Sequence, residues 1–367
     1  MSGSQPFPPP GGGPVEPPPP GWAPPPQPAP SAWGPPPGYG AGPPPPQWAP
    51  GMLGAAHKPG AMPLRPLGLG DFYDAAFRII RFNPKATVGS AVLVAAIAMA
   101  IPVLVTAVVT SLVDLSGDTF GEDSADLVGV GALYATTIVG SVLQYVGLIF
   151  VTGMVAHVTA AAAIGRRLSL GEAWAATRGS RWRLLGLTAI IGLVWVGLFG
   201  VYALLSVVVV VVASSWVPVL VWFVVTAPVI VAATWWIWIR VTYLPVPALM
   251  VERLGVFAAI GRGYRLTRRQ FWRTFGIALL TVVVTSVASS IITIPFAIVG
   301  PLASLAVSDE GAAVLILVTV NALGTVLATA FVAPFTSAVS SLQYLDQRMR
   351  KEAYDVELMA QAGITAS

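Results

Sequence analysis

The stretch LLGLTAIIGLVWVGLFGVYALLSVVVVVVASSWVPVLVWFVVTAPVIVAATWWIWI, residues 184–239, contains no charged residue. A hydrocarbon core about 30 Å thick is crossed by roughly 20 helical residues, because each helical residue rises about 1.5 Å. The stretch is therefore long enough for two crossings, and Ser214, Ser215, Trp216 and Pro218 predict the turn between them. We expect a membrane-spanning helical hairpin here.

Further apolar runs flank this hairpin. One crossing is expected within residues 86–113 and one within 127–164, where the first turns should project beyond the membrane. The last two fall within 274–306 and 312–342, on either side of an acidic pair. Only 10% of the 367 residues are charged and 55% are hydrophobic, whereas a soluble domain has about 25% charged residues. The composition excludes a soluble enzyme and predicts an all-α integral membrane fold with six transmembrane helices.

The charged residues are divided between the two sides of the membrane. The loops 114–126 and 307–311 hold seven acidic residues and no basic one. All 20 Lys and Arg residues lie in the terminal regions or in the loops 165–183 and 240–273. The positive-inside rule therefore predicts a multi-pass protein of the cell (inner) membrane with both termini in the cytoplasm. The basic balance indicates topology and contact with anionic lipids. No nucleic-acid-binding motif is present.

Residues 1–66 contain 25 of the 34 prolines and almost no aliphatic side chains. Such a segment cannot form a packed core, so we predict a disordered cytoplasmic tail with local polyproline II structure. It lacks the basic start and apolar run of a signal peptide. Two interpretations stay open: a ligand arm whose PxxP stretches bind cytoplasmic partner proteins, or a flexible spacer without a dedicated partner.

Two of the basic loops resemble each other. LGEAWAATRG at residues 170–179 and LGVFAAIGRG at 254–263 share Leu, Gly, Ala, Arg and Gly at identical spacing, and a Trp-Arg pair and an apolar run follow each. A fainter copy, LGDFYDAAFR, covers 69–78. The pattern predicts three pseudo-repeats, each a short interfacial helix followed by a transmembrane pair.

The short helices carry start signals. Ser169 and Glu172 predict a capping box, and Asp71 is expected to cap the first short helix. Two interpretations of that helix are compatible: it lies flat on the inner leaflet, or it packs beneath the bundle. Its predicted apolar face consists of Phe72, Ala76, Phe77 and Ile80.

Three segments carry a resemblance to a known family. They are LRPLGLGD at residues 64–71, the LG…A…RG copies, and YLDQRMRKEAYDVEL at 344–358. Over roughly residues 64–360 the chain resembles the membrane domain found beside glycerophosphoryl diester phosphodiesterases. The resemblance implies a stand-alone form typical of actinobacteria, with a proline-rich N-terminal tail. The catalytic barrel of those enzymes, with its histidines and metal-binding carboxylates, has no counterpart here. The resemblance therefore implies fold and location, and we decline the phosphodiesterase activity.

The residues also offer no catalytic constellation. The chain has no Cys and two His, His57 and His157, so thiolate sites and a multi-histidine metal centre are not expected. We predict no enzymatic activity, no cofactor and no metal site. Within the spans, His157, Gln144 and Asn321 are interpreted as structural groups that form hydrogen bonds between helices.

Arginines gather in the basic loops that enter the later spans. Clustered arginines select phosphate-rich lipids such as cardiolipin, because a guanidinium group binds phosphate through two parallel hydrogen bonds. The tail 344–367 is expected to be a mixed-charge helix, interpreted as a solvated cap on the bundle in preference to a docking site. The candidate contacts with anionic lipid are Arg178, Arg181, Arg183, Arg262, Arg265, Arg268, Arg269 and Arg273.

These features predict three parts: a tail over 1–66, a six-span membrane domain over 67–343, and a cytoplasmic charged helix and tail over 344–367. The leading hypothesis is a non-catalytic scaffold or lipid-associated membrane module that recruits cytoplasmic proteins through the tail. One alternative is a permease or lipid-handling transporter; another is the membrane subunit of a phosphodiesterase-type enzyme. The permease would use a cavity between the units, opened by proline kinks at Pro102, Pro228, Pro295 and Pro334.

Overall fold

The computed structural model describes residues 60–120 and 122–363, with side chains left out for 112–137. The chain divides into two units, Met1–Ala49 and Pro50–Ser367, and every described residue belongs to the second. Most of the predicted proline-rich tail therefore lies outside the described residues. Six helices are long and apolar enough to cross a membrane, and no described residue forms a strand, which confirms the predicted all-α class.

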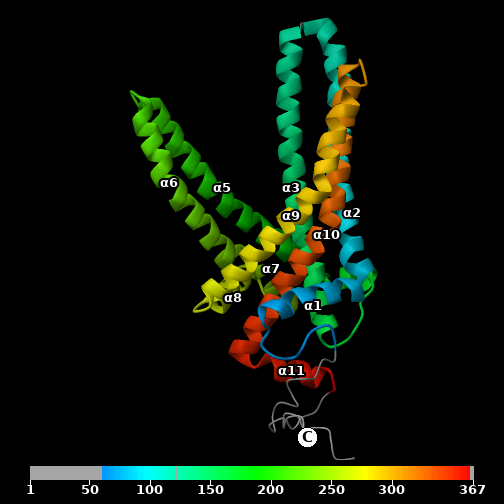
Figure 1. Ribbon diagram of the computed structural model, residues 1–367, viewed down its shortest axis with the longest axis vertical. Helices are drawn as coiled ribbons and strands as arrows, with labels where there is room; N and C mark the ends of the chain where they lie inside the picture. The colour runs from blue at the N-terminus through cyan, green and yellow to red at the C-terminus, as the bar shows by residue number, and fades with distance from the viewer. Residues whose placement is uncertain (1–59, 121, 364–367) are drawn as a thin grey trace, which may run out of the picture. The chain divides into compact units, whose positions relative to one another are not determined.

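The order of the elements follows the predicted pattern of short and long helices (Figure 1). They are α1 (Leu69–Phe82), α2 (Pro84–Phe120), α3 (Glu122–Ala163), α4 (Leu170–Ala176), α5 (Arg181–Val212), α6 (Trp216–Ile237), the π-helical turn η2 (Trp238–Thr242), α7 (Pro245–Val251), α8 (Val256–Thr267), α9 (Phe271–Ser304), α10 (Glu310–Glu352) and α11 (Tyr354–Gln361). A short helix thus precedes each pair of long ones. That the three units are related repeats stays a prediction.

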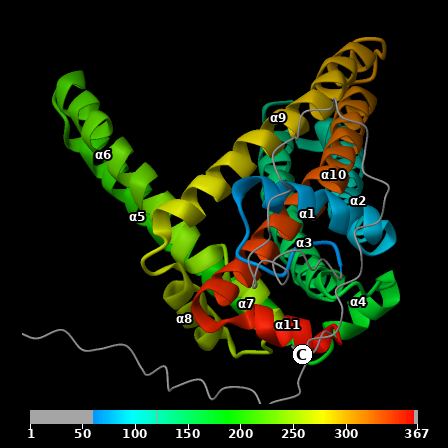
Figure 2. The same cartoon turned by 60° about the horizontal axis from the view of Figure 1, so that its bottom comes forward.

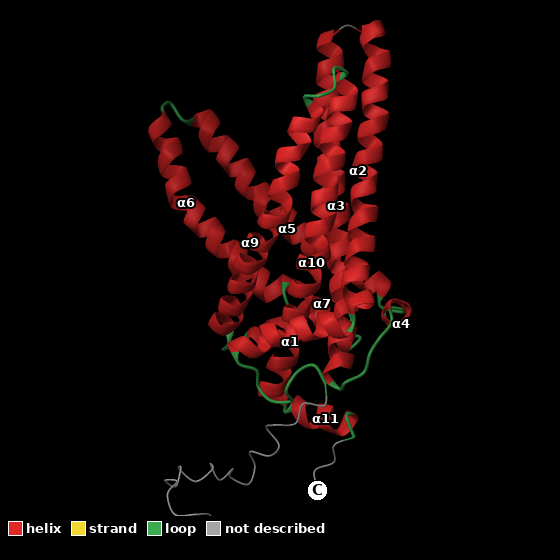
Figure 3. Ribbon diagram, turned by 45° about the vertical axis from the view of Figure 1, so that its right-hand side comes forward, coloured by secondary structure: helices red, strands yellow, loops and turns green. Residues whose placement is uncertain are grey.

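The long helices α2, α3, α9 and α10 pack together as a bundle, and the α5–α6 hairpin leans away from them (Figure 3). Glycines allow close approach within the bundle. A Cβ atom added at Gly147 of α3 would lie 2.3 Å from Val94 Cγ1 of α2, and one at Gly324 of α10 would lie 2.8 Å from Phe296 Cβ of α9. Small residues at helix contacts are typical of membrane bundles, where packing and hydrogen bonds drive association.

The α5–α6 hairpin makes few contacts outside its base. Helix α6 has no buried residue, and its turn with α5 lies at Ala213–Ser215, which confirms the predicted Ser214 and Ser215, whereas Trp216 and Pro218 belong to the first turn of α6. Its polar groups pair across the hairpin: Trp222 Nε1 donates to Ser206 Oγ at 3.1 Å, and the hydroxyls of Tyr202 and Thr226 lie 3.2 Å apart. The remaining surface is almost entirely apolar, which suits lipid on every side.

The short helices begin as their caps dictate. Helix α4 starts at the predicted capping box, in which Glu172 N–H donates to Ser169 Oγ and Ser169 N–H donates to Glu172 Oε2. The backbone and side-chain hydrogen bonds from Ser169 lower the pKa of Glu172. Asp71 caps α1 as predicted, from the third position of a helix that begins at Leu69: its carboxylate accepts from the Gly68 N–H at 3.0 Å.

Helix α1 packs beneath the bundle against α10, with Phe72, Ala75, Ala76 and Ile79 buried (Figure 2). Phe77 stays more than half exposed and contacts the Phe335 ring at a centroid distance of 4.9 Å. Some side chains of α1 that face away from the core are therefore apolar. The packing of α1 beneath the bundle is thus compatible with the other predicted interpretation, in which the helix lies flat on the inner leaflet.

The structure corrects two predictions about charged segments. The acidic segment 114–126 was expected to be a loop, but α2 continues to Phe120 and α3 begins at Glu122. The charged tail was expected to begin after the last span as a solvated cap. In the structure α10 runs unbroken to Glu352, and its last turns are buried, including Tyr344, Leu345, Asp346 and Gln347. Burial rather than solvation therefore stabilises this part of the helix.

Candidate functional site

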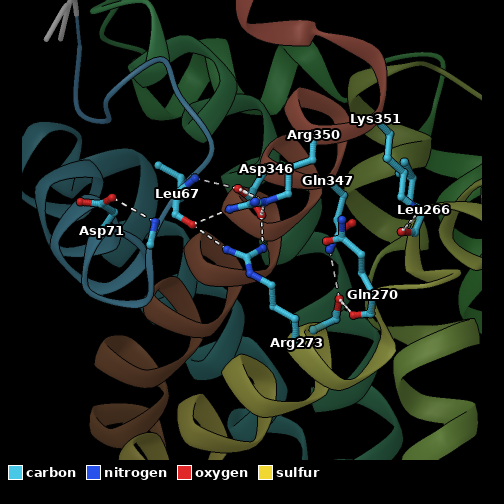
Figure 4. Close-up of polar contacts among 11 residues, drawn as sticks. Leu67, Asp71, Leu266, Gln270, Arg273, Asp346, Gln347, Arg350 and Lys351 are labelled. Atoms are coloured by element: carbon cyan, nitrogen blue, oxygen red, sulfur yellow. Dashed lines mark hydrogen bonds and ion pairs between the residues drawn. The ribbon is translucent and has the colours of Figure 1, made fainter. Parts of the chain in front are cut away.

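The buried end of α10 carries a carboxylate that joins three segments. The Asp346 side chain is 1% exposed and forms ion pairs with Arg273 of α9 at 2.5 Å and Arg350 at 3.0 Å. Asp346 also accepts from the Leu67 N–H at 2.8 Å, and both arginines donate to the Leu67 carbonyl (Figure 4). The segment before α1 is thereby fastened to α9 and α10.

A second network of charged groups joins α7, α8 and α10. Arg262 forms ion pairs with Glu252 at 2.8 Å and with Glu352, and Arg348 pairs with both carboxylates. The Tyr344 hydroxyl donates to Glu252. Burial opposes the charge of Arg262, but the hydrogen bonds to Glu352 and Glu252 outweigh it and raise the pKa of Arg262 above its usual value. These pairs have a structural role.

Lys351 fastens α10 to the end of α8. Its Nζ donates to the carbonyls of Leu266 and Arg268 at 2.8 Å each and of Arg265 at 3.1 Å. A helix end leaves its last carbonyls without partners, so a lysine placed there both satisfies them and complements the helix dipole. Its charge faces no described carboxylate within ion-pair distance.

A hollow of about 530 Å³, lined by basic residues, lies beside the contact between Lys351 and the end of α8. We call it the basic hollow. Its lining residues are Arg265, Arg268, Arg269, Gln270 and Lys351. The three arginines are exposed, and none forms an ion pair with a described residue. Arg269 has φ 66°, in the left-handed region that non-glycine residues seldom adopt. Four positive charges thus converge where α8 ends and α9 begins.

Aromatic rings border the start of α9. Phe271 and Trp272 follow the basic hollow directly, and their ring centroids lie 5.4 Å apart. Trp272 is 79% exposed. Exposed tryptophan beside basic residues is typical of the headgroup level of a membrane. The basic hollow therefore has an exposed tryptophan next to its basic residues.

The structure separates the eight arginines predicted to contact anionic lipid. It brings Arg265, Arg268 and Arg269 together, whereas Arg262 and Arg273 are held in the ion-pair networks described above. The others lie at the α4–α5 junction: Arg181 donates to the Trp174 carbonyl, Arg183 donates to the Arg253 carbonyl, and Arg178 is exposed. Sequence reasoning missed Lys351 and Gln270, because only the fold carries the end of α10 to the end of α8.

The polar groups predicted to join the spans behave differently from one another. Gln144 Nε2 of α3 lies 3.5 Å from Thr329 Oγ1 of α10, a long interhelical hydrogen bond. The prediction for Asn321 was wrong, since its Nδ2 donates to the Leu317 carbonyl of its own helix at 2.8 Å. His157 Nε2 is buried and forms no hydrogen bond within the described part of the chain.

Among the described residues, no three His, Asp or Glu side chains are grouped so as to hold a metal ion. Comparison with protein-family models, curated proteins and solved structures gives no match for this chain.

Proposed function

We propose that this protein is a non-catalytic membrane module that binds anionic phospholipid at its cytoplasmic face. The observation that carries the proposal is the basic hollow, in which Arg265, Arg268, Arg269 and Lys351 converge and no described lining residue is a carboxylate. The nearby carboxylate of Glu352 forms its ion pairs with Arg262 and Arg348 instead. A structural cluster of this charge would be self-repelling, because like charges at close range destabilise one another. A phosphate-bearing ligand removes that repulsion.

The chemistry of the basic hollow suits a lipid headgroup. Arginine binds phosphate through two parallel N–H donors, and Lys351 adds positive charge from a fixed position. The exposed Trp272 supports a position for the acyl chains of such a lipid beside the start of α9. Cardiolipin, which has two phosphates, matches several converging cations best.

Substitution of the basic hollow tests this function. In the Arg265→Gln/Arg268→Gln variant, retention of cardiolipin by the detergent-purified protein should fall roughly 30-fold, because each lost charge near anionic lipid is worth about 1 kcal/mol. Native mass spectrometry measures the retained lipid. High salt should weaken retention in the unsubstituted protein, since exposed charges are screened.

A matched variant separates the basic hollow from general surface charge. Arg81→Gln/Arg178→Gln also removes two exposed arginines, both outside the basic hollow. It should retain cardiolipin almost as the unsubstituted protein does. Equal losses in the two double variants would contradict a dedicated site and leave only the overall basic charge.

We further propose that the basic hollow faces the cytoplasm and that both termini are cytoplasmic, on the basis of the charge asymmetry between the loops. The chain has no Cys, so a single introduced thiol reports topology cleanly. Ser214→Cys should react with an impermeant maleimide added outside intact cells, whereas Arg178→Cys should react only after the membrane is opened. The reverse pattern would invert the proposed topology.

The proline-rich region adds the scaffold part of the proposal. Residues 1–66 contain the PxxP stretches that aromatic grooves of partner domains recognise, so we assign recruitment of cytoplasmic proteins to this region. The resemblance to the membrane domain found beside glycerophosphoryl diester phosphodiesterases supports an inner-membrane module of actinobacterial type. No lining residue of the basic hollow belongs to the tail, so a chain without residues 1–60 should still retain the lipid.

A further inference from the structure

A second hollow, of about 430 Å³, lies among α2, α3 and α10 within the spans, and we call it the intramembrane hollow. Asn321 lies on the wall of this hollow, 14 residues before Phe335 in the continuous helix α10. Phe335 contacts Phe77 of α1. At 1.5 Å per residue, the segment from Asn321 to Phe335 spans roughly 21 Å along α10. Since the hydrocarbon core is about 30 Å thick, the intramembrane hollow lies well inside it if α1 marks the inner boundary.

Polar groups on this wall lack full sets of partners. Thr106 is 3% exposed, and its Oγ1 forms no hydrogen bond with the side chains and backbone that the structure describes. Among the described residues, Gln144 has only the 3.5 Å contact with Thr329, and Asn321 satisfies its Nδ2 within its own helix. Polar atoms without partners are costly in hydrocarbon, where water does not compensate them.

The rest of the lining determines what can bind. No lining residue is ionisable, and Met99, Leu317 and Val318 contribute apolar walls. A charged headgroup would lose its hydration here without a counter-charge, which is expensive at this depth. The hollow thus combines an apolar wall and a few uncharged hydrogen-bonding groups, the usual character of a small-molecule site.

The geometry of the wall is held by close backbone contacts. A Cβ atom added at Gly140 of α3 would lie 2.6 Å from Pro102 Cγ of α2, so these helices touch at the edge of the intramembrane hollow. Asn321 Nδ2 lies 3.2 Å from the position of a Cβ atom at Gly300 of α9, which fixes the carboxamide on its outer side. Pro102 lies inside α2 and cannot donate a backbone hydrogen bond.

We infer that the intramembrane hollow binds an uncharged membrane lipid with a free hydroxyl group, such as a diacylglycerol. Gln144 Nε2 donates to the ester carbonyl, the carboxamide oxygen of Asn321 accepts from the hydroxyl, and the acyl chains lie along Met99 and Leu317. The inference goes beyond the anionic-lipid site, because the two hollows share no residue.

Photo-crosslinking of the full-length chain tests the site. The protein is reconstituted into phosphatidylcholine nanodiscs with a diazirine-bearing diacylglycerol, or with a phosphatidylglycerol that carries the same diazirine chains. The diacylglycerol should label peptides that contain residues 99–106 or 317–325 more strongly than the phosphatidylglycerol does. In Gln144→Met/Asn321→Leu, this labelling should fall about tenfold, because two hydrogen bonds are lost.

A control variant keeps the test specific. Thr293 lies in α9 outside the intramembrane hollow and bonds only within its own helix at 3.0 Å, so Thr293→Val should label as the unsubstituted protein does. Equal labelling by both probes, or labelling unchanged in the double variant, would overturn the inference. Absence of labelling by the diacylglycerol would do so too. Cardiolipin retention measured on the same variants should be unchanged, which separates this outcome from failure of the proposed function.

Discussion

Asp346→Ala is expected to lower the free energy of unfolding by about 3 kcal/mol, the low end for a broken buried ion pair. The carboxylate is 1% exposed and holds Arg273 and Arg350 together with the Leu67 N–H. Its removal leaves two guanidinium groups beside each other and a buried N–H without its acceptor. The low end applies because the side chains of Arg273 and Arg350 are partly exposed and partly hydrated. Unfolding of the purified protein in mixed micelles by a denaturing detergent measures the change.

A matched pair on the surface provides the control. Asp74 and Arg78 are also an aspartate and an arginine four residues apart, at 3.1 Å, but more than half of each side chain is exposed. Asp74→Ala should therefore cost less than about 1 kcal/mol. Asp346→Asn keeps an acceptor for the Leu67 N–H and should fall between the two. Equal costs for Asp346→Ala and Asp74→Ala would show that the buried network adds nothing to stability.

Gly324→Leu is expected to destabilise the bundle by about 3 kcal/mol, at the upper end of the usual cost of overpacking. A side chain at this position meets Phe296 Cβ and Cγ at 2.8 Å. Phe296 Cβ is attached to the backbone, so rotation of the phenylalanine cannot relieve the clash. Helices α9 and α10 must then move apart and lose contacts along their length. The same detergent titration measures this loss.

Two comparisons separate the clash from a general effect of leucine. Gly197 of α5 is exposed and has no atom within 4 Å of an added Cβ, so Gly197→Leu should be close to neutral. Adding Phe296→Ala to Gly324→Leu should recover part of the stability, since contacting residues are energetically coupled. A cost for Gly197→Leu as large as that for Gly324→Leu would refute the packing explanation.

The spans were predictable from composition alone. Charge-free runs of about 20 residues have one stable solution in hydrocarbon, because every backbone group must form its hydrogen bond inside a helix. The turn at Ser214 and Ser215 was predictable for the same reason, since it interrupts a run too long for one crossing. Capping was predictable too: Ser169 and Glu172 form their predicted box, and Asp71 caps α1 from its third position.

The charged end of α10 shows where sequence reasoning failed. Spacing of four residues correctly pairs Asp346 with Arg350 and Arg348 with Glu352. We nevertheless predicted a solvated helix from this spacing, because the sequence pattern of mixed charges is the same on a surface and in a buried network. Two partners of the buried Asp346 carboxylate are Leu67 and Arg273. Both lie far from Asp346 in the sequence.

By itself the sequence determined that the chain forms six helices long and apolar enough to cross a membrane and that basic and acidic loops alternate between them, because hydropathy and charge placement depend on composition along single segments. Only the tertiary structure decided which arginines are engaged in ion pairs and which form none with a described residue. It also decided that Lys351 completes the basic hollow and that Thr106, Gln144 and Asn321 border one cavity. Those assignments depend on distances between separate helices, which no local pattern encodes.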